Sequence, residues 1–145
     1  MRTRLLQESE GRRSYAVVFS IGEEAIAGLR AFADEQGLRG SQLTAIGAFQ
    51  RVVLGYFDWS AREYARHEFN EQVEVASLIG NIAVDDDGTR VLHAHAVVGR
   101  RDGTALAGHL LAGQVRPTLE VIVEEMPEHL HRRRDAQSGL LLLAP

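Results

Sequence analysis

Three histidines, His93, His95 and His109, are the most concentrated chemical feature of this 145-residue sequence. His93 and His95 lie two residues apart, so their side chains point to the same face if the segment is a β-strand. Neutral imidazoles suit zinc or a similar first-row ion, and three of them leave a fourth coordination position open. Such a site stays cationic and would attract a carboxylate, a phosphate or a hydroxide. The alternative is an ordinary polar patch of hydrogen-bonded histidines.

Whether His109 joins the other two histidines depends on the register of a predicted β-hairpin. Residues 91–99 and 104–111 are predicted strands, and the Asp-Gly pair in the segment 100–103 between them is typical of a tight turn. A three-residue loop with Gly103 in the left-handed conformation places His95 opposite His109. A two-residue Asp102-Gly103 turn places His109 on the opposite face. The metal hypothesis therefore requires the longer loop.

Other titratable residues offer weaker candidates. Glu120 interrupts the apolar run 119–123, where it could hydrogen-bond a ligand histidine or act as a general base near a bound water. The alternative is an outward-facing carboxylate. His129 and His131 share the two-residue spacing but adjoin the arginines 132–134, and we interpret residues 129–135 as a solvated, charged connection. His67 stands alone and receives no role.

The composition argues against several classes of function. A net charge of −4 opposes nucleic-acid binding through phosphate contacts, which usually requires a basic surplus. The sequence has no cysteine, which excludes disulfides and thiolate metal sites and is compatible with a cytoplasmic protein. No apolar run approaches the roughly 20 residues that cross a bilayer. We therefore expect a cytoplasmic protein without membrane contact.

The predicted elements are one helix and many strands. Ile26, Leu29, Phe32 and Ala33 recur at helical spacing, and Gly37 follows as a stop signal, so the sequence predicts a helix over 23–36. This arrangement predicts an α+β fold, with the helix near the N-terminus packed on a mainly antiparallel β-sheet, in one domain over residues 1–145. Besides the two hairpin strands, strands are predicted at 14–20, 42–57, 63–69, 71–78, 79–85 and 119–125, with a last apolar segment at 139–144.

Several segments resemble the plants-and-prokaryotes conserved domain, called PPC or PCC. They are Leu92-His93-Ala94-His95, Gly108-His109-Leu110-Leu111-Ala112-Gly113 and the segments 44–48, 75–81 and 133–140. The resemblance covers nearly the whole chain in the right order. It implies an α+β fold, a homotrimer, and a metal bound by the H-x-H…G-H-L pattern, which here falls on His93, His95 and His109. In plants this domain accompanies AT-hook motifs, whereas this sequence has no Arg-Gly-Arg-Pro core, as in the stand-alone prokaryotic type.

Three functions follow from these observations. The first is a homotrimeric module whose three-histidine site holds a divalent metal ion, zinc before others, and binds a small anionic ligand. The second is a hydrolase-like enzyme in which the metal lowers the pKa of a bound water. The third is a DNA-binding regulatory protein, as the family is often labelled, which the charge and the missing AT-hook make doubtful. We favour them in that order.

Overall fold

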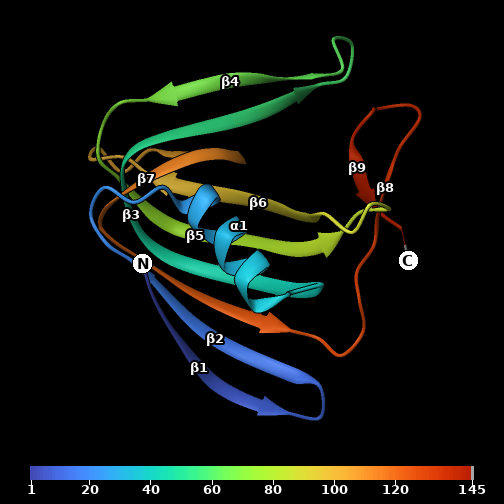
Figure 1. The fold of residues 1–145 in the computed structure, drawn as a ribbon. Coiled ribbons are helices and arrows are strands. Elements are labelled where there is room, and N and C mark those ends of the chain that lie inside the picture. Colours follow the sequence, from blue (N-terminus) through green and yellow to red (C-terminus); the bar gives the residue numbers. More distant parts are fainter. Residues whose placement is uncertain (145) are drawn as a thin grey trace.

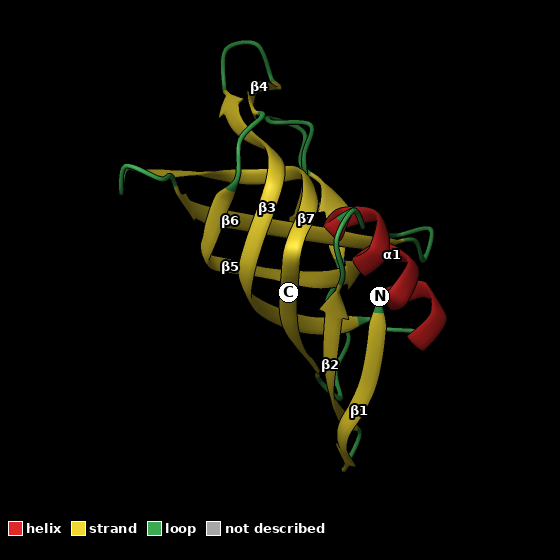
Figure 2. Ribbon diagram, turned by 90° about the vertical axis from the view of Figure 1, so that its left-hand side faces the viewer, coloured by secondary structure: helices red, strands yellow, loops and turns green. Residues whose placement is uncertain are grey.

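The computed structural model describes residues 1–144, and a curved, seven-stranded sheet with one helix against its concave face dominates it (Figures 1 and 2). Every pairing between named strands is antiparallel, as the sequence predicts for this single α+β domain. In chain order the elements are β1 (Arg2–Ser9), β2 (Arg12–Phe19), α1 (Ala25–Gln36), β3 (Gly40–Asp58), β4 (Glu63–Phe69), β5 (Val73–Val84), β6 (Arg90–Gly99), β7 (Ala105–Glu125), β8 (Arg132–Arg134) and β9 (Leu141–Leu143).

Two long strands organise the sheet. The strand order is β1-β2-β7-β6-β5-β3-β4, and β3 also pairs directly with β7, so β3, β7, β6 and β5 form a closed circuit of pairings. Register shifts along β3, including one beside Gly47, bend the strand as it passes from one neighbour to the next. The last two strands, β8 and β9, form a separate small hairpin near the ends of β5 and β6 (Figure 1).

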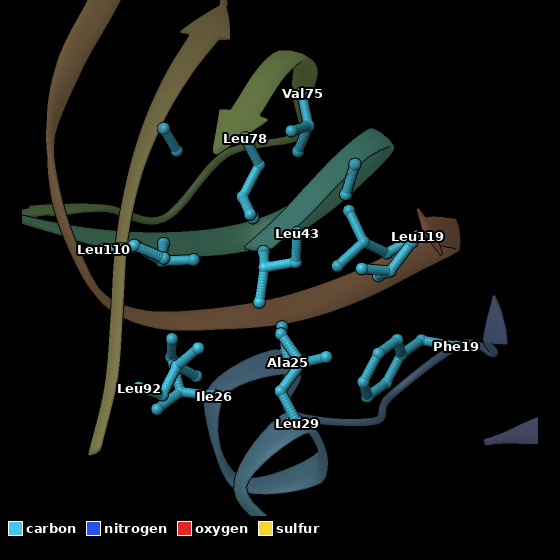
Figure 3. Close-up of a cluster of buried hydrophobic side chains, with 14 of the residues drawn as sticks. Phe19, Ala25, Ile26, Leu29, Leu43, Val75, Leu78, Leu92, Leu110 and Leu119 are labelled. Carbon is cyan, nitrogen blue, oxygen red and sulfur yellow. The ribbon is translucent and has the colours of Figure 1, made fainter. Parts of the chain in front are cut away.

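The core lies between the sheet and α1. Leu29 and Phe32 of the helix are fully buried, and Figure 3 shows helix side chains facing strand residues such as Leu43 and Leu78. On β6 the buried positions alternate, with Leu92 and the alanines at 94 and 96 facing this core. The odd-numbered side chains of β6 therefore point to the outer face of the sheet.

The helix begins two residues later than predicted, at Ala25. Glu24 is its N-cap residue, and its carboxylate accepts a hydrogen bond from the backbone N–H of Ala27 at 2.7 Å and another from Gly113 of β7 at 2.8 Å. Gly37 ends the helix with φ of 65°, in the left-handed region that favours glycine, as expected. Through the bond from Gly113, Glu24 also joins the helix to the sheet.

Four of the predicted strands are parts of two longer ones. The segments predicted at 71–78 and 79–85 are one strand, β5, and those at 104–111 and 119–125 are parts of β7. The N-terminal strand β1 was not predicted, because all of its residues are exposed and give no apolar alternation. The segment 129–135, interpreted as a solvated connection, contains β8, which pairs with β9. No helix within residues 1–144 is long and apolar enough to span a membrane.

Gly28 provides a test of the packing between α1 and β2. A Cβ at this position would overlap the ring of Phe19, which is 1% exposed. Helix propensity alone favours Gly28→Ala by about 1 kcal/mol, whereas overpacking costs about 1–3 kcal/mol. We expect this substitution to lower the free energy of unfolding, measured by denaturant titration. In a Phe19→Leu background the same substitution should be neutral or stabilising. Stabilisation in the parent protein would contradict this account.

Candidate metal centre

The three histidines lie on the outer face of the sheet, on two neighbouring strands. His93 and His95 come from β6, where they alternate with the buried Leu92, Ala94 and Ala96. His109 comes from β7 and is followed by the buried Leu110. Because alternate side chains of a strand point to opposite faces, burial of the apolar neighbours directs all three imidazoles outward.

The hairpin between β6 and β7 has the register that the metal hypothesis requires. His95 pairs with His109, and the pairing continues to Gly99 opposite Ala105. The backbone N–H of Arg100 donates to the carbonyl of Thr104 at 2.8 Å, which closes a three-residue loop, and Gly103 has φ of 84°. The longer loop is therefore confirmed, with its glycine in the left-handed region.

The imidazoles are close enough to share one ion. One ring nitrogen from each histidine lies within 4.8 Å of the others, and the ring centroids are 4.9–5.3 Å apart. The Nε2 atoms of His93 and His95 are 3.2 Å apart. Two nitrogens bound to one tetrahedral zinc ion, each about 2.0–2.1 Å from it, lie about 3.3 Å apart. The spacing of this pair, and the neutral nitrogen donors of all three residues, therefore fit a zinc ion.

Burial keeps two of the imidazoles neutral. Desolvation, with smaller contributions from the charges of His93, His95 and Arg132, lowers the pKa of His109 to about 4. Desolvation also lowers the pKa of His93, and Arg132 and His95 add to that effect. The Nδ1 atom of His109 is buried and has no hydrogen-bond partner within residues 1–144. Neutral imidazole is the form that binds a metal ion.

Tyr64 of β4 covers one side of the cluster. Its ring stacks on the His109 imidazole with centroids 4.6 Å apart and an interplanar angle of 22°. Gly55 of β3, which pairs with His109, leaves the space for this contact, since a Cβ there would lie 2.8 Å from the Tyr64 ring. Tyr64 was not predicted as part of the site, because its position depends on a neighbouring strand and on the absence of a side chain at Gly55.

Arg132 is buried, contrary to the interpretation of residues 129–135 as solvated. It is 3% exposed. Its guanidinium donates to the Leu141 carbonyl at 2.6 Å and to Asn81 Oδ1 at 2.6 Å, and it lies 3.3 Å from His93 Nδ1. Pairing of β8 with β9 and the contact with β5 remove it from solvent. Its neighbours Arg133 and Arg134 are exposed, as interpreted.

The remaining candidates do not meet the cluster. Glu120 is exposed on β7, in register with Val18 and Ile46, and makes no hydrogen bond to a histidine ring in the part of the chain that the structure describes. No contact within the described part of one chain therefore supports a role for Glu120 at the metal. His129 and His131 are both exposed.

The low pKa of His109 is directly measurable. In the metal-free protein, we expect its Cε1–H resonance to titrate with a midpoint at about 4, against about 6.5 for an unperturbed histidine. The reason is that protonation would place a charge in a half-buried site beside Arg132. An NMR pH titration, assigned with a His109→Gln variant, makes the measurement. A midpoint at or above 6.5 would show that the ring is solvated.

Solved structures share this fold along nearly their whole length. A PPC protein from Pyrococcus horikoshii has a TM-score of 0.84 and 27% identity, covering 99% of this chain and 95% of its own. A metal-containing protein from Archaeoglobus fulgidus has a TM-score of 0.83 and 31% identity, covering 91% and 93%. A protein from Bacteroides thetaiotaomicron, provisionally described as DNA-binding, has a TM-score of 0.85 and 29% identity, covering 98% and 96%.

The family comparison agrees with these structures. A search of curated proteins gave no match. The family model of the Plants and Prokaryotes Conserved (PCC) domain matches residues 6–127, which include all three histidines. The fold, the structural similarities and this match lead to one conclusion: the chain belongs to the PCC domain family.

Proposed function

We propose that this protein is a homotrimeric metal-binding module, in which His93, His95 and His109 hold a zinc ion whose open position takes a small anionic ligand. The observation that carries the proposal is the convergence of three imidazoles across one hairpin. The Archaeoglobus protein of the same fold is described as metal-containing, which supports a metal at this site.

The donor set supports zinc and an anionic ligand. Three uncharged nitrogen ligands leave the full charge of a divalent ion in place, so a negative fourth ligand is favoured. When bound, zinc supplies Lewis acidity to whatever occupies that position. The chain itself excludes water from one side with Tyr64, which stacks on His109, and holds a second cation, Arg132, beside His93. Both features favour an anion over a neutral ligand.

The outer face of the sheet supports self-association. Ile46, Ile79 and Ile122 are 60%, 59% and 43% exposed, and they line one shallow hollow together with Ser77 and Glu120. Exposed apolar side chains gathered in this way mark a protein interface more often than an open surface. Ile79 pairs with His95, so the apolar patch begins beside the histidines. A second copy of the chain on this patch would border the metal site.

The metal hypothesis predicts a clear effect of removing a ligand. Replacing His93, His95 or His109 with alanine should lower zinc affinity well beyond the about 10–100-fold that changes in supporting hydrogen bonds cause. His129→Ala, at an exposed histidine, should have no comparable effect. Competition titration with a zinc chelator measures this. Because burial lowers the pKa values of His93 and His109, we expect protons to compete with zinc for these two rings only below about pH 6.5. Equal zinc affinity in the three variants and the parent would refute the site.

The proposed assembly has its own test. Light scattering at micromolar concentration should give three times the chain mass of 16.0 kDa. Ile79→Glu should shift the protein toward the monomer, because it places a charge in the apolar patch, whereas Arg133→Glu outside the patch should not. A stable monomer of the parent protein would contradict the proposed trimer.

DNA binding is expected to be weak, although the Bacteroides protein carries a DNA-binding description. The net charge of −4, from 20 acidic and 16 basic residues, makes the overall field repulsive to phosphates. We expect no retention of a duplex in a mobility-shift assay at about 150 mM salt. Tight binding with a steep salt dependence would favour the DNA-binding function instead.

A further inference from the structure

Arg132 is a buried cation without a counter-charge. The residue is 3% exposed, and no ion pair joins it to a carboxylate within residues 1–144. Its partners are a backbone carbonyl, the Asn81 amide and an imidazole, and its Nε atom has no acceptor in this part of the chain. Burying a charge is costly unless it is paired. The guanidinium remains cationic at neutral pH, so an anion from outside the chain would stabilise it.

A pocket of about 170 Å³ lies beside this cation. The imidazoles of His93 and His109, the Tyr64 ring and Arg132 line it, and residues 140–142 form an apolar wall. An apolar cavity of about 150 Å³ holds a benzene-sized molecule. The pocket therefore suits a ligand of roughly six to eight non-hydrogen atoms.

The β8–β9 hairpin supplies the cation and one wall of this pocket. Arg132 and the leucines at 140–142 all come from the hairpin. The hairpin is held in place by the carboxylate of Asp135, which accepts hydrogen bonds from Ser138 N and Oγ at 2.7 Å each, and by the bonds of Arg132 to Asn81 and Leu141. It thus brings one charge and an apolar surface to the edge of the histidine cluster.

We propose that this pocket binds a small carboxylate with a short apolar chain, and that Arg132 supplies the positive charge that selects it. The proposal deepens the proposed function, on which it rests for the neighbouring metal ion, by naming the ligand class. The carboxylate supplies the counter-charge that Arg132 lacks, and the apolar chain lies against the leucines. Inorganic phosphate has the charge but lacks the apolar part, so it should bind more weakly.

The contact between Arg132 and His93 indicates that Arg132 binds the carboxylate and does not stabilise the metal ion. A histidine that binds zinc through Nε2 carries a proton on Nδ1 and normally donates it to an acceptor. Here Nδ1 faces an arginine, which can only donate. Arg132 therefore opposes the ion while attracting the anion. Its removal should leave zinc affinity equal or higher and lower carboxylate affinity, which a purely structural role would not do.

Calorimetric titration of the zinc-loaded protein tests the ligand class. The probes are isobutyrate, with six non-hydrogen atoms, its neutral isostere isobutyramide, and inorganic phosphate. We expect isobutyrate to bind at least about tenfold more tightly than isobutyramide, which lacks the charge, and than phosphate, which lacks the apolar chain. Equal affinity for isobutyrate and isobutyramide, or no binding of isobutyrate, would overturn the proposal.

Variants then test the residue. Arg132→Met should lose at least about tenfold in isobutyrate affinity, and Arg132→Lys should retain part of it. Arg132→Gln keeps hydrogen-bonding capacity without the charge, and serves if the methionine variant does not fold. The matched control is Arg133→Met, because Arg133 is exposed and faces Asp86 at 3.5 Å. A folded neutral variant that binds isobutyrate as the parent does would refute the role of Arg132.

Titrations of the metal-free protein distinguish failure of the metal site from failure of the ligand class. If the parent takes up no zinc, the proposed function fails, and the same titrations are made without metal. Isobutyrate binding that depends on Arg132 would then still support the ligand class, whereas no binding to either form would overturn it. If zinc binds but isobutyrate does not, the metal site stands and the ligand class fails.

Discussion

The antiparallel pairing of β6 with β7, which sets His95 directly opposite His109, is the constraint on which the rest of the site depends. A slip of one residue would turn His109 toward the core and bring the buried Leu110 to the surface. Core packing therefore opposes the slip, and so does the loop closed by Arg100 and Thr104. The hydrophobic pattern of the hairpin therefore places the three histidines on one face.

The electrostatics of the outer face follow from this arrangement. Three imidazoles and the buried Arg132 lie together, and no carboxylate forms an ion pair with Arg132 in the described part of the chain. Desolvation keeps His93 and His109 neutral, which prepares the site for a cation, while Arg132 favours an anion. These opposite preferences are compatible if metal and anion bind together. The exposed isoleucines next to His95 place a proposed subunit interface at the border of the same site.

The sequence predicted the parts of the molecule that local pattern determines. The helix stripe around Leu29 and Phe32 and the tight turn over residues 100–103 both correspond to short-range signals, and the structure confirms them. The sequence left two registers open for the hairpin that carries the histidines, because it did not determine the length of the loop. The resemblance to the PCC family supplied the fold and was confirmed.

Other features depend on contacts between distant segments. Strand β1 is exposed along its length, so hydrogen bonding to β2 defines it without an apolar pattern. Arg132 and Arg133 are adjacent and chemically identical, yet one is buried and the other exposed. Only the approach of β9 and Asn81 makes that difference. The position of Tyr64 over His109 likewise depends on Gly55 in a third strand.

The most direct test of the metal centre is a crystal structure of the zinc-loaded protein with anomalous data collected at the zinc edge. The account predicts one anomalous peak on the outer face of β6 and β7, about 2.0–2.1 Å from one nitrogen of each of His93, His95 and His109. A peak at other residues, or a zinc-saturated crystal with no peak between these three imidazoles, would contradict it.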